Sequence, residues 1–304
     1  MTFADQVNQQ DAATMIKAFK NSGSNEIDSA FVYVGGKTEI LLGELQKQKH
    51  LENCLLATKV NPLKTGLGKE SIDQQFTTSL QRLAVDKVDL LYLHQPDLDT
   101  PIEESLAAIN EHHSAGRFER FGLSNYAAWQ VADIYRICER EGYLLPTVYQ
   151  GMYNALTRDV ERELLLCLKD FNIAFYVYNP LAGGMLSGKH TSFSALPQQG
   201  RFSTNKQYQN RYWKKDYFNA IDKFAATCRD EKIAPSTAAL RWLVHHSALD
   251  DQKADAVILG ASKMEHFNSN LTAMTEGALP RSVINTLDEG WELSRADCIK
   301  YFRP

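Results

Sequence analysis

Four polar residues, Asp28, Tyr33, Lys59 and His94, stand at or just after the ends of short apolar runs. The runs cover residues 26–31, 54–58 and 88–93, and a helical pattern follows each of them. Such alternation predicts βα units, and the C-terminal ends of parallel strands in a barrel converge on one mouth. We therefore expect the four side chains to share one pocket, where they could protonate a carbonyl oxygen during its reduction.

The residue types suit that chemistry. Tyrosine has a pKa near 10 and becomes a useful acid when a nearby cation stabilises its phenolate. Lys59 would supply the charge, Asp28 would hold Lys59 in place, and His94 would form a second hydrogen bond to the substrate oxygen. The plainer interpretation makes Asp28 and Lys59 a buried structural ion pair, with Tyr33 and His94 as core residues. Four such residues at strand ends favour the catalytic interpretation.

The elements that would position these residues form seven strand-plus-helix units after an opening helix at 11–21. The predicted strands are 26–31, 54–58, 87–93, 120–123, 147–150, 174–178 and 256–259. The predicted helices are 39–48, 72–83, 102–115, 127–142, 160–171, 216–231, 236–246 and 264–273. This alternation favours a (βα)8 TIM barrel over a doubly wound sheet. The stretch 180–215 is predicted to be irregular.

Composition limits the function classes. The 304 residues are 44% hydrophobic with a net charge of −4, so one barrel domain over 1–304 is expected, with no basic face for nucleic acid. The five cysteines form no CxxC pair, and no basic leader or stretch of 18 apolar residues is present in this sequence. We expect a cytoplasmic protein that does not bind membranes.

A glycine-rich run at 179–189 follows a predicted strand, and glycine lets backbone amides approach a phosphate closely. Gly183, Gly188 and Lys189 even match the GxxxxGK spacing of a P-loop. The match fails at His190, which stands where a magnesium-binding Ser or Thr is required. A clamp for a pyrophosphate fits this run better. Near the end of the chain, Ser-Lys-Met-Glu at 262–265 predicts a capping box at a helix start, as does Thr-Pro-Ile-Glu at 100–103.

The order and spacing of the four polar residues resemble the aldo-keto reductases. The runs Gly-Leu-Ser-Asn-Tyr-Ala-Ala-Trp at 122–129, Pro-Thr-Val-Tyr-Gln-Gly-Met-Tyr-Asn at 146–154 and Asn-Arg-Tyr-Trp at 210–213 resemble the aflatoxin aldehyde reductase branch of that family. The resemblance implies reduction of aldehydes or ketones with NADPH, Tyr33 being the general acid. It also implies that the chain begins inside the turn after the first barrel strand, so we expect that strand to be truncated or missing.

The resemblance further implies roles for other residues. Ser124, Asn125 and Gln150 would bind the nicotinamide carboxamide, and Tyr178 would stack on the ring. The rest of the NADP would lie against Asn179, Leu181, Gly183, Lys189, Ser262, Lys263, His266 and Asn270, with Ser262, Lys263 and His266 near the adenosine 2′-phosphate. Tyr208, Arg211 and Arg303 would bind the substrate, a small carbonyl compound. Arg211 and Arg303 match arginines of a branch that reduces carboxylated aldehydes such as succinic semialdehyde.

Other functions stay open. A nicotinamide-binding regulatory subunit, like the β subunits of potassium channels, would share most of these residues. A serine hydrolase is disfavoured because Tyr126 stands where the second glycine of a nucleophile elbow belongs. The histidine pairs at 112–113 and 245–246 lack metal-ligand spacing, so no metal is expected. A homodimer is compatible with the sequence.

Overall fold

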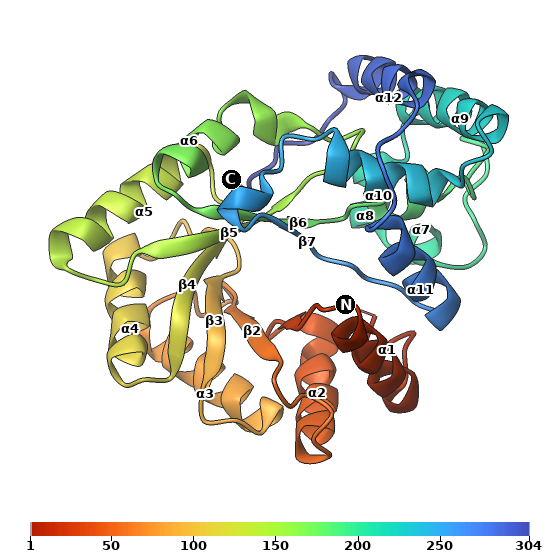
Figure 1. Cartoon of the computed structure of the whole chain (residues 1–304). Helices are drawn as coiled ribbons and strands as arrows, with labels where there is room; N and C mark the ends of the chain where they lie inside the picture. The colour runs from red at the N-terminus through yellow and green to blue at the C-terminus, as the bar shows by residue number, and fades with distance from the viewer. Residues whose placement is uncertain (1, 304) are drawn as a thin grey trace.

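Seven parallel strands form one curled sheet in the computed structural model, which describes residues 2–303 (Figure 1). The strands pair in chain order, and every pairing is parallel. They are β1 Glu26–Asp28, β2 Leu55–Val60, β3 Val88–Leu93, β4 Phe118–Ser124, β5 Pro146–Met152, β6 Ala174–Tyr178 and β7 Ala256–Val257. A doubly wound sheet would reverse its strand order, so this order confirms the prediction of a TIM-barrel-like fold.

Helices alternate with the strands and cover the outer face of the sheet (Figure 1). The longer ones are α1 Gln9–Asn21, α2 Lys37–Lys47, α3 Lys69–Leu83, α4 Ile102–Ser114, α5 Ala128–Glu141, α6 Leu164–Asp170, α9 Lys215–Asp230, α10 Pro235–His245, α11 Met264–Ala273 and α12 Arg281–Ser294. The stretch predicted to be irregular contains the 3-10 segment η3 Ala182–Ser187 and the short helices α7 Arg201–Thr204 and α8 Lys206–Tyr212. Helix α12, which the sequence analysis did not predict, packs against α9.

The sheet is open between β1 and β7, each of which has one strand neighbour. Among residues 2–303 no strand precedes α1, and the segment before that helix holds a single isolated bridge between Phe3 and Val7. The expectation of a missing first strand is therefore confirmed, and the architecture is a curled part-barrel of seven strands.

Alternate residues of each strand face opposite sides of the sheet. Leu91 and Phe121 belong to the large core between sheet and helices, whereas Leu90 and Tyr92 pack inside the curl. Gly122 explains how Tyr92 fits there, because a Cβ at position 122 would lie 2.3 Å from the Tyr92 ring. This inner side of the sheet also holds the polar residues of the site.

Both predicted capping boxes are wrong. Helix α4 begins at Ile102 and α11 at Met264, which leaves Pro101 and Lys263 at the N-cap positions, and neither helix has a side-chain cap bond. The Thr100 hydroxyl bonds to Asp97 instead. Each helix starts one residue later than its box requires, so Ser262 is not a helix cap.

Candidate active site

Lys59 and Asp28 form a buried ion pair at the C-terminal ends of β2 and β1. Lys59 Nζ lies 2.7 Å from both carboxylate oxygens of Asp28 and 2.7 Å from the Ser29 carbonyl oxygen, and the lysine is 0% exposed. These three acceptors satisfy the three protons of the ammonium. Gln150 of β5 donates to Asp28 at 2.9 Å, so three strands meet at this carboxylate.

Tyr33 lies on a tight turn beyond β1. Strand pairing continues past Asp28, since the Phe31 amide donates to the Lys59 carbonyl oxygen at 3.1 Å, and the 3-10 segment η1 Tyr33–Gly36 follows. The turn needs positive φ at Val34, Gly35 and Gly36. It brings the Tyr33 ring over Lys59, with Nζ 4.9 Å from the ring centre. The Tyr33 hydroxyl forms no hydrogen bond within residues 2–303, and the Lys59 protons go to Asp28 and Ser29 instead.

His94 follows β3 and completes the cluster. Its ring centre lies 5.7 Å from that of Tyr33, at an interplanar angle of 76°. The amide of His94 donates to the Val60 carbonyl oxygen at 2.9 Å, which extends the pairing of β2 with β3. The four residues expected to share a pocket are therefore brought together at one end of the sheet.

Burial sets the protonation states of these groups. It raises the pKa of Tyr33 well above 10, with a further contribution from Asp28, and it lowers the pKa of His94 well below 6.5. Burial also lowers the pKa of Lys59, against the opposing effect of Asp28. The expectation that Lys59 lowers the pKa of Tyr33 is not met, because Asp28 neutralises the ammonium and desolvation dominates. At neutral pH, Tyr33 thus keeps its proton and His94 is uncharged.

The residues expected around a nicotinamide lie on neighbouring strand ends. Tyr178, the last residue of β6, donates its hydroxyl to Asn125 Oδ1 at 2.7 Å. Asn125 Nδ2 in turn donates to the His94 carbonyl oxygen at 2.8 Å and to Ser124 Oγ at 2.9 Å. Asn125 therefore ties the ends of β3, β4 and β6 together, and both protons of its amide nitrogen are used by these protein contacts.

The glycine-rich loop after β6 lies next to the start of α11. Ala182, Gly183 and Gly184 have consecutive positive φ values, which turn the chain tightly at η3, and Leu181 precedes this turn. Farther along, Lys189 Nζ lies 3.4 Å from His266 Nε2 of α11. Residues predicted for the pyrophosphate and the 2′-phosphate thus border one another, with Ser262 and Lys263 before the helix and Asn270 buried within it.

Arg211 and Arg303 approach the same end of the sheet from distant parts of the chain. Burial raises the pKa of Tyr33 and of Tyr178, and the charge of Arg303 opposes this rise at both tyrosines, as that of Arg211 does at Tyr178, so both charges lie near the cluster. Burial, followed by repulsion from Arg211, lowers the pKa of Arg303 itself. Neither arginine forms an ion pair with a carboxylate among the described residues 2–303.

Contacts with neighbouring side chains hold these two arginines. Arg211 lies 5.5 Å from the centre of the Tyr208 ring, and Arg303 donates to Gln95. Tyr208 is 6% exposed and donates to Asn179 Oδ1 at 3.1 Å, so it joins α8 to the end of β6. Tyr208 therefore supports the loop in this structure, while the two guanidinium groups have no carboxylate partner within residues 2–303.

Sequence reasoning missed two residues of the site. Asn61 Nδ2 lies 3.1 Å from His94 Nδ1, and Gln75 of α3 binds the backbone of Asn61. Asn61 could have been found from strand periodicity, because it is two residues beyond Lys59 and so points to the same side of the sheet. Gln75 could not have been found from the sequence, because a polar residue within an amphipathic helix is not unusual.

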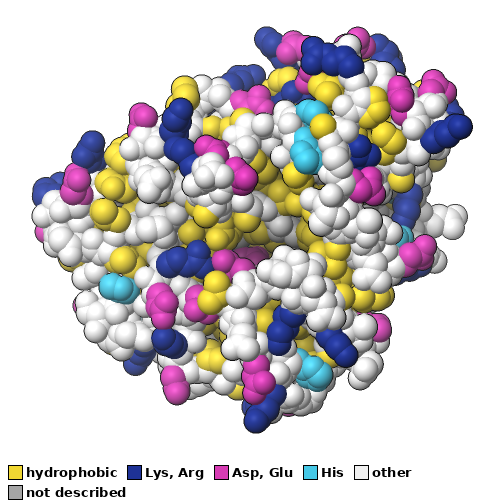
Figure 2. Space-filling view, in the orientation of Figure 1, with side chains coloured by type: hydrophobic (Ala, Val, Ile, Leu, Met, Phe, Trp, Pro, Cys, Tyr) yellow, Lys and Arg dark blue, Asp and Glu magenta, His cyan; other side chains and the backbone are white. Residues whose placement is uncertain are grey.

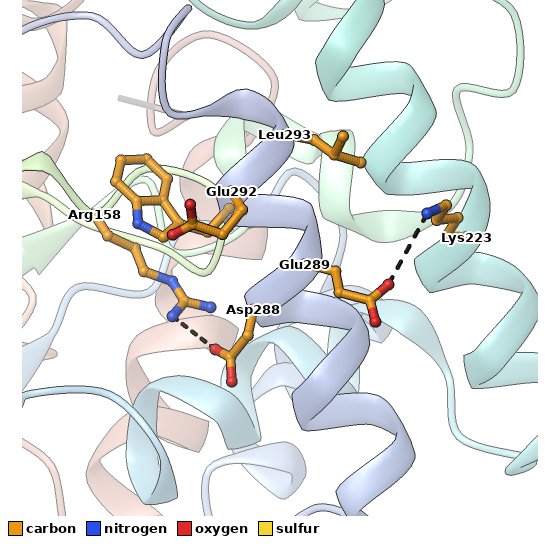
Figure 3. Close-up of a pocket in the computed structure, with 7 residues that line it drawn as sticks. Arg158, Lys223, Asp288, Glu289, Glu292 and Leu293 are labelled. Carbon is orange, nitrogen blue, oxygen red and sulfur yellow. Dashed lines mark hydrogen bonds and ion pairs between the residues drawn. The ribbon is translucent and has the colours of Figure 1, made fainter.

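The molecular surface is hollowed at the centre of the face shown in Figure 2, where hydrophobic and acidic side chains line the opening. A separate hollow of about 600 Å³ lies at α12, bordered by Arg158, Lys223 and Asp288. Figure 3 shows two ion pairs among its charged side chains: Arg158 with Asp288 at 2.8 Å and Lys223 with Glu289 at 3.9 Å. None of the four clustered residues lines it, so it is not part of this site.

Within residues 2–303, no three His, Cys, Asp or Glu side chains are grouped as a metal site would need. In the same part of the chain, every helix is too short or too polar to cross a membrane. The cytoplasmic location and the homodimer stay predictions.

Comparison with known proteins shows which sequences this chain resembles. The model of the aldo/keto reductase family matches residues 1–292. The chain is 45% identical to rat aflatoxin B1 aldehyde reductase member 2 over 305 residues, covering 96% of this chain and 83% of the rat protein. It is also 45% identical to human aldo-keto reductase family 7 member A3 and 44% identical to human aflatoxin B1 aldehyde reductase member 4, covering 96% of this chain and 92% of each relative.

Proposed function

Because the chain belongs to the aldo/keto reductase family, we propose that it reduces aldehydes with NADPH and that Tyr33 donates the proton. The family and the aldehyde reductases among its relatives support an oxidoreductase acting on carbonyl groups. The observation that carries the proposal is the convergence of Tyr33, Lys59, Asp28 and His94, with the Tyr33 hydroxyl unpaired among residues 2–303.

The bound cofactor would supply a hydride to the carbonyl carbon, and the protein's own residues handle the oxygen. The Tyr33 hydroxyl, protonated at neutral pH, donates its proton to that oxygen as negative charge develops. Lys59, 4.9 Å from the ring centre, stabilises the phenolate that remains. Asp28 keeps the ammonium in place, and uncharged His94 donates a second hydrogen bond to the oxygen.

The surroundings fit a dinucleotide that runs from Tyr178 to α11. Tyr178 offers an aromatic face beside the cluster, and the tight turn at 182–184 leads to Lys189. Ser262, Lys263 and His266 would hold the 2′-phosphate at the N-terminus of α11, where a helix favours an anion, and Lys189 of the pyrophosphate loop lies beside His266. This group of cationic and donor side chains is the basis for proposing NADPH over NADH.

The substrate is proposed to be an aldehyde that carries a carboxylate. Arg211 and Arg303 are near enough to repel one another, and neither has a carboxylate partner among the described residues. A guanidinium binds carboxylate through a planar fork, so an acid group on the substrate would relieve that repulsion. Held in this way, the aldehyde end would face Tyr33.

The alternative is a regulatory subunit that binds the nicotinamide cofactor and reduces substrates only incidentally. Measuring NADPH oxidation by the purified chain with a panel of aldehydes separates the two functions. The enzyme requires oxidation that saturates with substrate and is fastest for carboxylated aldehydes such as succinic semialdehyde. Tight NADPH binding with equally slow oxidation in every aldehyde would instead support the regulatory subunit.

A further inference from the structure

The contact between Asn61 and His94 specifies where the imidazole carries its proton. Asn61 Nδ2 lies 3.1 Å from His94 Nδ1. An amide nitrogen only donates, so Nδ1 accepts this bond, and an uncharged imidazole that accepts at Nδ1 carries its proton on Nε2. Within residues 2–303 the His94 ring forms a hydrogen bond through Nδ1 alone, so the Nε2–H is free to donate.

The backbones of Asn61 and His94 are both held by further hydrogen bonds. Gln75 forms two bonds to the Asn61 backbone: its Oε1 accepts from the Asn61 amide at 2.9 Å, and its Nε2 donates to the Asn61 carbonyl oxygen at 2.9 Å. Gln75 is 2% exposed and also bonds to Ser71 Oγ at 3.0 Å. On the other side, Asn125 Nδ2 donates to the His94 carbonyl oxygen at 2.8 Å. Gln75 of α3 thus holds the Asn61 backbone, and Asn125, which follows β4, holds the His94 backbone.

We propose that Asn61 is a positioning residue that keeps His94 in the Nε2–H tautomer, with Gln75 fixing Asn61 in turn. The inference rests on the proposed function, in which His94 donates a hydrogen bond to the substrate oxygen. The opposite tautomer would present a lone pair to that oxygen and so repel it as negative charge develops. Asn61 therefore acts on the reaction through His94 without touching the substrate.

Two variants of Asn61 test this role. In Asn61→Asp the side chain can only accept, so His94 must place its proton on Nδ1. Asn61→Ala removes the partner without adding charge. Asn110→Asp is the matched control, because Asn110 Oδ1 accepts from the Leu144 amide and an aspartate keeps that bond. Nitrogen-15 NMR of histidine-labelled full-length protein distinguishes a protonated from an unprotonated ring nitrogen, and loss of one signal pair in His94→Gln assigns His94.

In the wild-type protein we expect a protonated Nε2 and an unprotonated Nδ1 at His94. At a pH high enough that the ring carries a single proton, Asn61→Asp should reverse the two, Asn61→Ala should give a mixture, and Asn110→Asp should match the wild type. Removing an oriented donor to a developing oxyanion costs about 10²–10³-fold in kcat, so Asn61→Asp should lose that much aldehyde reduction. Asn61→Ala should lose less, and NADPH affinity should be unchanged in both.

A wild-type spectrum with the proton on Nδ1 would overturn the proposal, as would an Asn61→Asp variant that keeps the wild-type kcat. The spectrum needs neither cofactor nor substrate. If the protein reduces no aldehyde, the proposed function fails, while the NMR still decides whether Asn61 sets the tautomer.

Discussion

The ammonium of Lys59 lies 4.9 Å from the centre of the Tyr33 ring, while its protons point to Asp28 and Ser29. Lys59 Nζ therefore lies over the face of the Tyr33 ring and forms no hydrogen bond to the Tyr33 hydroxyl. With Asp28 cancelling much of the lysine charge, burial raises the pKa of Tyr33. The ammonium matters most once the phenol has lost its proton, because only then does Tyr33 carry a charge.

Lys59→Met should lower kcat for aldehyde reduction by about 10²-fold or more, since it leaves the Asp28 charge uncompensated beside the phenolate. Breaking a buried pair also destabilises the fold by about 3–5 kcal/mol. Thermal unfolding should separate the two effects. The double variant Asp28→Asn with Lys59→Met should recover stability but not activity, and a Lys59→Met enzyme with wild-type kcat would contradict this role.

Stability should fall as the pH drops below about 6.5, because unfolded His94 takes up a proton that the folded protein excludes. The pKa of His94 is lower in the folded protein than in the unfolded chain. The free energy of unfolding is therefore highest above pH 6.5 and falls in more acid solution. The slope from one such histidine is at most about 1.4 kcal/mol per pH unit. Urea unfolding between pH 7.5 and 5.5 should give a shallower dependence for His94→Gln than for the wild type.

The exposed His50 provides the control, and His50→Gln should keep the wild-type dependence. Burial also lowers the pKa of His112, His190 and His246, so His94→Gln should reduce the dependence without abolishing it. Identical slopes for wild type and His94→Gln would show that His94 is not held uncharged.

NADPH should bind more tightly than NADH by about ten- to a hundredfold, the difference that one charge-assisted phosphate contact supplies. Lys263→Ala should reduce this preference, whereas Lys17→Ala, a change at an exposed position of α1, should not. Fluorescence titration with both cofactors measures the ratio. Equal dissociation constants of NADPH and NADH in the wild type would mean that no residue of the site recognises the 2′-phosphate.

Arg211→Ala should raise the KM for succinic semialdehyde by about tenfold or more and leave that of an uncharged aldehyde of similar length nearly unchanged. Only the charged substrate loses a contact. Arg201→Ala is the matched control, since Arg201 also lies over the Tyr208 ring, at 4.7 Å. If Arg211→Ala impairs both substrates alike, Arg211 supports the loop and does not bind a carboxylate.

The strand ends explain why much of the fold and the cluster could be predicted. Lys59 and His94 follow apolar runs whose length and composition are those of buried strands, and parallel pairing brings their ends together. Boundaries were less accurate: β1 ends at Asp28, whereas the predicted strand continued to Phe31, where the chain turns toward η1. Periodicity reports burial but does not report where a turn begins.

Contacts between residues far apart in the sequence determine the features of the site that could not be predicted. The raised pKa of Tyr33 depends on how completely Asp28 and burial offset Lys59, which no residue spacing reveals. Tyr208 was expected at the substrate, yet its hydroxyl reaches Asn179, 29 residues away in sequence. The tie between Asn61 and His94 likewise joins two strand ends through side chains, so it becomes visible only in three dimensions.

The most direct test of the account is a single turnover of the enzyme loaded with NADPH, comparing the wild type with Tyr33→Phe. We expect wild-type protein mixed with excess succinic semialdehyde to oxidise one NADPH per site and to form the alcohol. Tyr33→Phe should bind NADPH equally well and oxidise it about 10²–10⁴-fold more slowly, as loss of a general acid predicts. Equal rates for the two proteins would contradict the assignment of Tyr33 as the proton donor.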